Sequence, residues 1–162
     1  MSEAHDRAAR LGSTLETRRL TLATAESLTG GGLGELMSAA PGATRSYVGG
    51  VIAYATAVKH QLLGVSSATV AAHGVVSAEC AAEMARGVRA LLGSDIGVST
   101  TGVAGPERQE DKPVGLVFVC VADVEGTRTH ELRLSGERGE VRAAACLHAV
   151  TAVLDTLTGR GV

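Results

Sequence analysis

A serine stands in the glycine-rich segment Glu26–Gly32, where its surroundings favour either of two roles. Ser27 follows an expected strand and precedes an expected helix, so it lies at a tight strand-to-helix turn. Backbone N–H groups at such a turn could stabilise an oxyanion beside an attacking hydroxyl. The same position suits a helix N-cap, and the Gly-x-Ser-x-Gly and Ser-x-x-Lys patterns of serine enzymes are absent here. Ser27 is therefore a candidate nucleophile with a structural alternative.

Two residue types that can move protons are scarce in this chain and occur close together. Only Lys59 and Lys112 are lysine among the 15 basic residues, and one of the 2 tyrosines, Tyr54, lies shortly before Lys59. Arginine stays protonated, whereas a buried lysine can lose its proton near neutral pH. A lysine beside a phenol could take the proton of a serine hydroxyl. The alternative is a tyrosine at the core edge and a solvated lysine.

Glycines and arginines give two candidate sites for a phosphate. The glycines after Ser27 could hold an anion or serve helix packing, although they fit neither the P-loop nor the Gly-x-Gly-x-x-Gly pattern. Arg138 and Arg142 lie at helical spacing near the last expected helix, where they could clamp a phosphate or stay solvated.

The 5 histidines are scattered without ligand-like spacing, which disfavours a metal hydrolase.

Hydrophobic periodicity and turn residues predict the elements that must position these side chains. The expected helices are Glu3–Arg19, Leu33–Ala40, Ala55–Leu63, Ser66–Ala72, a helix capped by Ser77 and ending at Leu92, and Val141–Leu157. The expected strands are Leu20–Ala25, Tyr47–Tyr54, Ile96–Val103 and a hairpin of Val114–Val124 and Thr127–Leu134. This order predicts an α/β fold, a three-layer α/β/α sandwich with a mixed sheet, as a single domain over residues 1–162.

Three expected loops carry the candidate residues, and each follows a strand. They are the turn at Ser27, the junction from Tyr54 to Lys59, and the loop from Gly102 to Lys112. In α/β sheets the ligand crevice lies beyond the carboxyl ends of the strands. We therefore expect the three loops to converge on one site, with Glu110, Asp111 and Lys112 in solvated positions.

Composition limits the class of protein. The chain has 162 residues, 45% hydrophobic and 20% charged, with a formal net charge of −2, as in an ordinary soluble globular domain. Without a basic excess we expect no nucleic-acid partner. The apolar stretches are too short to cross a membrane and the N-terminus is polar, so we expect a cytoplasmic protein. The 3 cysteines are widely spaced among apolar neighbours, which indicates core residues.

Four blocks of sequence together resemble the CinA C-terminal domain family. They are Ala25–Gly31, Tyr54–Lys59, Thr101–Pro106 and Lys112–Gly115, and they follow the family's order across nearly the whole chain. Members that this chain resembles are nicotinamide-nucleotide amidases. These enzymes hydrolyse the carboxamide of nicotinamide mononucleotide to nicotinate mononucleotide and ammonia, without a metal or another cofactor.

The resemblance implies a serine nucleophile at Ser27 with Tyr54 and Lys59 as its activating partners. It also implies a ligand cradle in the turn Thr101–Gly105, with Arg138 and Arg142 on the phosphate side. The expected substrate-binding residues are Thr29, Gly30, Gly31, Thr101, Gly102, Ala104, Gly105, Arg138 and Arg142. A homo-oligomer, dimeric or larger, is a further implication of the resemblance.

The chain departs from the family pattern at three places. Leu28 replaces the usual cysteine after the nucleophile, and Ala55-Thr56 replaces a Ser-Asn pair. The loop after Pro106, typically glycine-rich, reads Glu107–Asp111 and carries charge. Two alternatives therefore stay open, an amidase for another pyridine-nucleotide amide and a nucleotide-binding or partner-docking module without catalysis.

Overall fold

The computed structural model describes residues 2–159. Its helices are α1 (Glu3–Arg18), α2 (Gly32–Ser38), α3 (Ala43–Ser46), α4 (Thr56–Leu63), α5 (Ser67–His73), α6 (Ala78–Leu92) and α7 (Arg138–Thr158). Its strands are β1 (Leu22–Glu26), β2 (Tyr47–Ile52), β3 (Ile96–Gly102), β4 (Leu116–Asp123) and β5 (Gly126–Arg133). These elements form one α/β domain.

The five strands form a mixed sheet in the order β2-β1-β3-β4-β5. Strands β2, β1 and β3 are parallel, whereas β4 runs antiparallel to β3 and β5 antiparallel to β4. Strand β5 therefore has the direction of β3, and four strands end at the same edge of the sheet. The chain leaves β1 for β2 on one side and returns to β3 on the other, so the topological switch point lies between β1 and β3.

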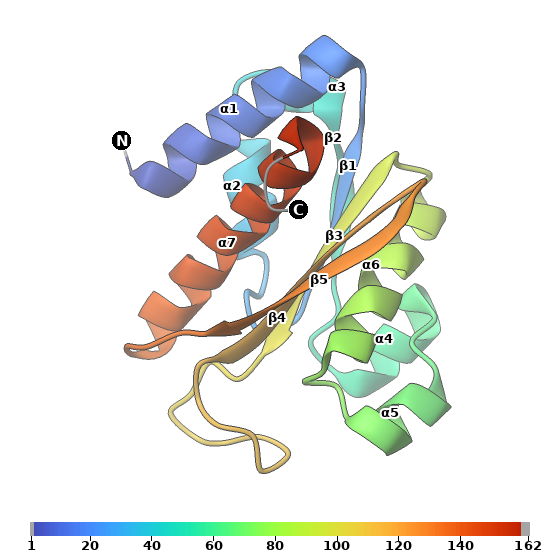
Figure 1. Ribbon diagram of the computed structural model, residues 1–162, viewed down its shortest axis with the longest axis vertical. Helices are drawn as coiled ribbons and strands as arrows, with labels where there is room; N and C mark the ends of the chain where they lie inside the picture. Colours follow the sequence, from blue (N-terminus) through green and yellow to red (C-terminus); the bar gives the residue numbers. More distant parts are fainter. Residues whose placement is uncertain (1, 160–162) are drawn as a thin grey trace.

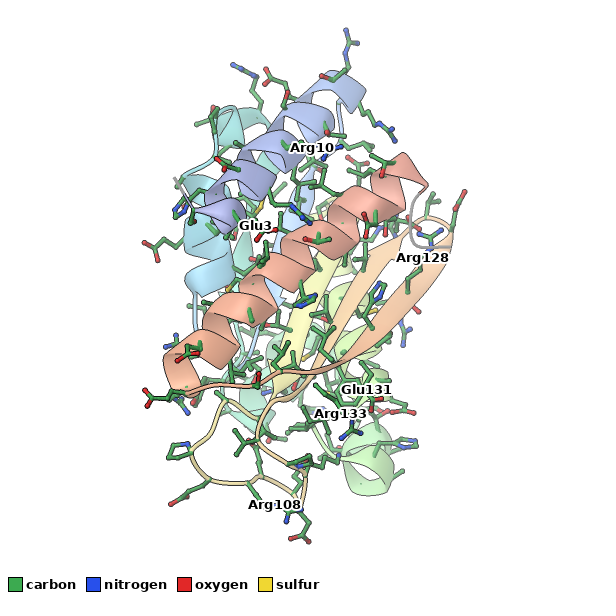
Figure 2. The ribbon with its side chains drawn as sticks, turned by 60° about the vertical axis from the view of Figure 1, so that its left-hand side comes forward. Glu3, Arg10, Arg108, Arg128, Glu131 and Arg133 are labelled. Atoms are coloured by element: carbon green, nitrogen blue, oxygen red, sulfur yellow. The ribbon has the colours of Figure 1, made fainter. Side chains whose placement is uncertain are left out.

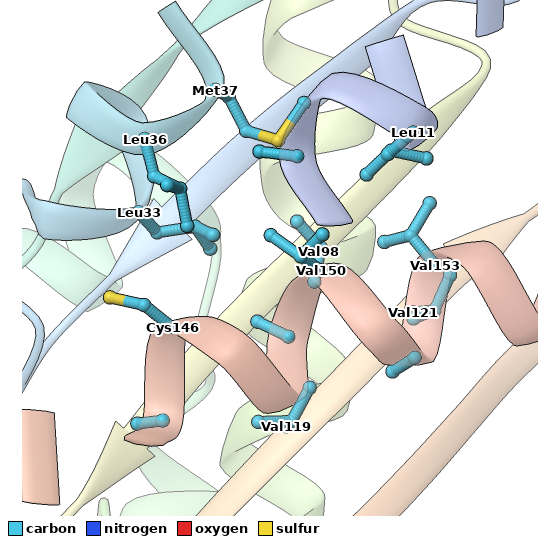
Figure 3. Packing of buried hydrophobic residues seen from close by; sticks show 14 of the residues in the cluster. Leu11, Leu33, Leu36, Met37, Val98, Val119, Val121, Cys146, Val150 and Val153 are labelled. Carbon is cyan, nitrogen blue, oxygen red and sulfur yellow. The ribbon is translucent and has the colours of Figure 1, made fainter. Parts of the chain in front are cut away.

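Helices cover both faces of this sheet (Figure 1). Helices α1, α2 and α7 pack on one face, where Val98, Val119 and Val121 point toward Val150 and Val153 of α7 (Figure 3). Helices α4, α5 and α6 pack on the other face around the alternate residues of the same strands. Strands β1 and β3 are buried along their whole length, as expected for strands covered on both faces. The expected three-layer α/β/α sandwich is confirmed.

Several predicted boundaries were wrong, because periodicity does not register capping and turn geometry. Helix α7 begins at Arg138 rather than Val141, since Glu137 is its extended N-cap and the polar first turn carries no apolar signal. Strand β4 begins at Leu116 rather than Val114, because a turn precedes it in which the Leu116 N–H donates to the Pro113 carbonyl. The short helix α3 was not predicted.

Helix α7 is long and apolar enough, by length and composition alone, to cross a membrane. Its apolar residues, however, pack against the sheet and against α1 within the larger hydrophobic cluster. A core helix that is buried along one face has the same composition, and this is the position that α7 takes in the fold (Figure 1).

Candidate active site

Loops that follow β1, β2 and β3, together with the start of α7, meet at the carboxyl edge of the sheet. They surround a cavity of about 420 Å³. Its lining residues are Ser27, Leu28, Tyr54, Gly102, Val103, Ala104, Gly105, Pro106, Glu107, Arg108, Gln109 and Arg138. The convergence expected from the sequence is therefore present, and it lies next to the topological switch point of the sheet.

Ser27 is half-buried at the end of β1, where its N–H donates to the Thr100 carbonyl of β3 at 3.0 Å. The N-cap of α2 is Gly31, not Ser27, so the helix-cap alternative is wrong. Gly30 and Gly31 have φ values of 56° and 104°, a left-handed backbone that lets the chain turn sharply before the helix. The hydroxyl of Ser27 is thus left free for another partner.

That partner is Lys59, which lies in the second turn of α4. Its Nζ donates to the Ser27 Oγ at 2.9 Å, to the Ala53 carbonyl at 2.7 Å and to the Tyr54 carbonyl at 3.2 Å. Lys59 is 1% exposed, so the alternative of a solvated lysine is wrong. A neutral amine has two N–H groups and one lone pair. With its N–H groups on the two carbonyls, the lone pair would face the Ser27 hydroxyl.

Burial lowers the pKa of Lys59, because desolvation disfavours the charged amine. Negative charge on Cys80 and Glu110 would act in the opposite direction. The Cys80 thiol, however, has its own pKa raised by burial to about 11, so it carries no charge near neutral pH. The site therefore favours a lysine that gives up its proton more readily than an exposed one.

Tyr54 contacts Lys59 through its carbonyl group and turns its phenol elsewhere. The Arg138 Nη2 donates to the Tyr54 hydroxyl at 2.9 Å, and the Arg138 Nη1 donates to the Gly105 carbonyl at 2.7 Å. The Tyr54 side chain is mostly exposed and forms a wall of the cavity together with Arg138. Activation of Ser27 by the Tyr54 phenol stays a prediction, and Arg138 lies at the cavity as expected.

Glu26 is a residue of this site that sequence analysis missed. Its carboxylate is 2% exposed, and it accepts the N–H groups of Gly31 and Leu33 on Oε1 and that of Gly34 on Oε2. The Thr29 hydroxyl donates to the same Oε1 at 2.7 Å. A carboxylate at a helix N-terminus is stabilised by the helix dipole. Glu26 therefore takes over the capping of α2 and holds the turn that carries Ser27.

The second loop of the cavity is the turn after β3. Gly102, Ala104 and Gly105 line the cavity, and the N–H groups of Ala104 and Gly105 have no acceptor within residues 2–159. Free amides in a turn can hold an anion or a carbonyl oxygen. Thr101, by contrast, is buried and donates its hydroxyl to the Val75 carbonyl at 2.7 Å. It supports the turn and is not a lining residue.

The remaining expected binding residues are Thr29, Gly30 and Gly31 of the Ser27 turn and Arg142 of α7. Thr29 and Arg142 line a second cavity of about 380 Å³ between α1, α2 and α7. Gly30 lies against the Arg142 guanidinium, and Gly31 lies beside the Ile52 side chain. The first cavity does not include these residues among its lining.

The charged loop Glu107–Lys112 is exposed from Glu107 to Asp111, as expected, but the side chains of Glu110 and Lys112 also anchor it to the segment before α6. The Glu110 carboxylate accepts the Val75 and Val76 N–H groups at 3.0 Å each. Burial alone would raise the pKa of Glu110, but these two bonds and the Lys112 charge hold it below its ordinary value. Lys112 donates to the Val76 carbonyl and to the His73 carbonyl.

The free part of this loop forms the outer rim of the cavity. Glu107, Arg108 and Gln109 line the cavity, and Figure 2 shows Arg108 on the loop at the bottom of the view. Two arginines and one carboxylate therefore border the cavity.

The three cysteines are buried and free, which confirms them as core residues, and burial raises the pKa of Cys146 to about 12.

The sequence profile of the CinA C-terminal domain family matches residues 4–157. A CinA-like protein from Frankia casuarinae is 47% identical over 145 residues, which cover 90% of this chain and 34% of that protein. A CinA-like protein from Gemmatimonas aurantiaca is 51% identical over 142 residues, covering 86% of this chain and 33% of that protein. The chain thus spans about a third of the length of the curated relatives it matches.

Solved structures agree with this assignment. A CinA superfamily protein from Klebsiella pneumoniae has a TM-score of 0.94 and 33% identity, covering 98% of this chain and 99% of that one. The competence/damage inducible protein CihA from Agrobacterium tumefaciens has a TM-score of 0.92 and 30% identity, with 98% and 97% covered. Fold and site together define an α/β protein in which a serine and a buried lysine meet at a cavity beyond a mixed sheet. The chain belongs to the CinA C-terminal domain family.

Proposed function

We propose that this chain is a nicotinamide-nucleotide amidase, which hydrolyses the carboxamide of nicotinamide mononucleotide through Ser27. The observation that carries the proposal is the contact between Ser27 and Lys59, because Nζ lies 2.9 Å from Oγ and the amine is buried. A lysine whose pKa is lowered by burial can act as a general base for a serine hydroxyl.

In the proposed reaction the neutral Lys59 amine takes the proton of the Ser27 hydroxyl while Oγ attacks the carboxamide carbon. Backbone N–H groups of the turn after Ser27 stabilise the oxyanion of the tetrahedral intermediate. The intermediate collapses as the Lys59 ammonium protonates the departing nitrogen, and ammonia leaves. Water then loses a proton to Lys59 and attacks the acyl ester. The Lys59 ammonium returns this proton to the departing Ser27 oxygen, so nicotinate mononucleotide leaves and both residues are restored.

The charge and size of the cavity support a nucleotide substrate. A volume of about 420 Å³ is in the usual range for a small-molecule site. Arg138 uses one hydrogen from each of two nitrogens on Gly105 and Tyr54, so other guanidinium N–H groups stay available for a phosphate. The exposed Tyr54 ring gives the pyridinium ring of such a substrate an aromatic surface for stacking.

The charged rim favours a second candidate substrate for the same amide hydrolysis. Glu107, Arg108 and Gln109 place polar side chains at a rim where the family pattern has glycines, so another pyridine-nucleotide amide could fit the cavity better. Comparing rates for nicotinamide mononucleotide, nicotinamide riboside and the dinucleotide separates the two candidates.

The direct test is to incubate the purified chain with nicotinamide mononucleotide and to assay ammonia and nicotinate mononucleotide together. We expect release in equal amounts by the wild type and none by Ser27→Ala. Equal release by Ser27→Ala would refute the mechanism, whereas absence of release by the wild type would refute the substrate. Calorimetric binding without turnover would instead favour a nucleotide-binding or docking module.

A further inference from the structure

Within residues 2–159, most backbone N–H groups in the turn after Ser27 have a hydrogen-bond acceptor, but two have none. Each N–H from Gly30 to Gly34 donates within the turn, to the Glu26 carboxylate or to a carbonyl oxygen. The N–H groups of Leu28 and Thr29 have no acceptor within the described part of the chain, residues 2–159. A residue directly after a nucleophilic serine commonly contributes its N–H to an oxyanion hole. Leu28 and Thr29 are therefore the donors that the turn leaves for an oxyanion.

Arg142 holds the carbonyl groups of the same two residues. Its Nε donates to the Leu28 carbonyl at 3.0 Å, and its Nη2 donates to the Thr29 carbonyl at 3.0 Å. A Cβ atom at position 30 would lie 3.0 Å from Nη2, so the glycine there leaves room for the guanidinium. The planar guanidinium thus grips two successive carbonyl groups of the turn.

The geometry of the peptide bond links this grip to the free amides. The Leu28 carbonyl and the Thr29 N–H belong to one planar trans peptide, so they point in opposite directions. Arg142 on the carbonyl therefore directs the Thr29 N–H to the other side of the turn. The Leu28 N–H is directed in the same way, because the Ser27 carbonyl of its peptide accepts the Gly30 N–H at 3.1 Å.

We propose that Arg142 is a positioning residue that orients an oxyanion hole formed by the Leu28 and Thr29 N–H groups, an inference that rests on the proposed acyl transfer at Ser27. Leu28 lines the same cavity as Ser27, whereas Arg142 reaches the turn from the second cavity behind it. A hydrogen bond from the guanidinium also polarises the peptide group and strengthens its N–H as a donor. Arg142 then acts on the reaction without touching the substrate, in contrast to a phosphate contact.

Kinetics with two substrates distinguish these roles. A positioning residue should lower kcat for nicotinamide mononucleotide and nicotinamide riboside alike, because both form the same oxyanion. A phosphate contact should instead raise KM for the phosphorylated substrate alone. Loss of one oxyanion donor costs about 10²–10³ in kcat. Since Arg142 orients donors and is not one, we expect Arg142→Gln to lower kcat by about 10-fold to 100-fold, with KM nearly unchanged.

Arg142→Lys keeps the charge but cannot reach two carbonyl groups with a planar fork, so it should be nearly as slow. Guanidinium ion at millimolar concentration should restore part of the rate of Arg142→Ala. Arg86→Gln, an exposed arginine on α6, serves as the matched control and should keep the wild-type rate. A purely structural role for Arg142 would show no such rescue.

A fluorophosphonate probe tests the inference apart from the substrate. The Ser27 Oγ displaces fluoride from phosphorus, its proton passes to Lys59, and the phosphoryl oxygen takes the place of the oxyanion. Intact mass gives the rate of labelling, which should be at least about 10-fold lower in Arg142→Gln. Hydrogen exchange of the segment 24–34 in the same variant should be faster than in the wild type.

Labelling and exchange at wild-type rates in Arg142→Gln would overturn the inference. If the wild type labels at Ser27 but releases no ammonia, the substrate is wrong, and slower labelling of Arg142→Gln would still support the positioning role. A wild type that does not label at Ser27 would overturn both proposals. An effect on KM confined to nicotinamide mononucleotide would assign Arg142 to the phosphate.

Discussion

Lys59 must lose a proton before it can accept one from Ser27, so its titration is the sharpest test of the proposed chemistry. Because burial lowers the pKa of Lys59 below its ordinary value of 10.5, kcat/KM should rise with pH and level off below that value. The rise should be about tenfold per pH unit while the amine is mainly protonated. Lys59→Met, which has no base at this position, should lose about 10²–10⁴ of the rate.

The same substitution has an expected effect on stability that follows from the contacts of Nζ. Lys59 forms three hydrogen bonds, each worth about 1 kcal/mol. Burial of a protonated amine costs several kcal/mol in the other direction. These effects nearly cancel, so the free energies of unfolding of the wild type and Lys59→Met should differ by less than about 2 kcal/mol near neutral pH.

The difference should depend on pH with a defined sign. Between the folded pKa of Lys59 and 10.5 the unfolded chain binds more protons than the folded one, so wild-type stability rises with pH relative to Lys59→Met. Urea denaturation of both proteins between about pH 7 and about pH 10 measures this difference. A difference independent of pH, with kcat/KM still rising at pH 10.5, would show that Lys59 titrates like an exposed lysine and would refute the mechanism.

Three further substitutions test the parts around the serine. Glu26→Gln places an amide N–H₂ against the Gly34 N–H, so urea denaturation should show a loss of about 1–3 kcal/mol, together with lower activity. Glu110→Ala leaves the Val75 and Val76 N–H groups without an acceptor and should lower thermal stability by about 1–3 kcal/mol. The wild-type contribution of Glu110, whose pKa is lowered, should be present above pH 4.5 and lost as the pH falls further, so the two melting temperatures should converge in acid. Arg138→Gln should raise KM for nicotinamide mononucleotide more than for nicotinamide riboside, and equal changes would exclude a phosphate contact.

The layers of the fold could be predicted from the sequence because strongly apolar segments dominate them. The segment Ile96–Val103 has the continuous small and apolar pattern of a strand covered on both faces, and β3 occupies nearly that range. Helix α3 has four residues and no periodicity to detect. The start of α7 depends on the backbone conformation of Glu137, which the order of apolar residues does not encode.

The candidate site was predictable in its residues but not in the direction of its side chains. The scarcity of lysine and the order of the motifs brought Ser27 and Lys59 together, and they lie 2.9 Å apart. Glu26 was missed because a glutamate beside a turn is usually solvated, although several N–H groups at the adjacent helix start offered a partner. Whether Arg142 turns to a ligand or to the backbone depends on packing between α7 and the turn.

Both lysines of this chain donate to backbone carbonyl groups, so the scarcity of lysine does not point to proton transfer alone. Lys59 donates to the Ala53 and Tyr54 carbonyls, and Lys112 donates to the His73 and Val76 carbonyls. An ammonium or amine group donates tetrahedrally to converging acceptors, a geometry that planar guanidinium cannot copy. Lysine at both positions fits this donor geometry, and within residues 2–159 the Lys112 amine contacts two carbonyl groups and Glu110 but no serine. Lys59→Arg would disturb both properties and Lys59→Met removes both, so the pH dependence of rate and stability, and not the loss of rate alone, tests the base.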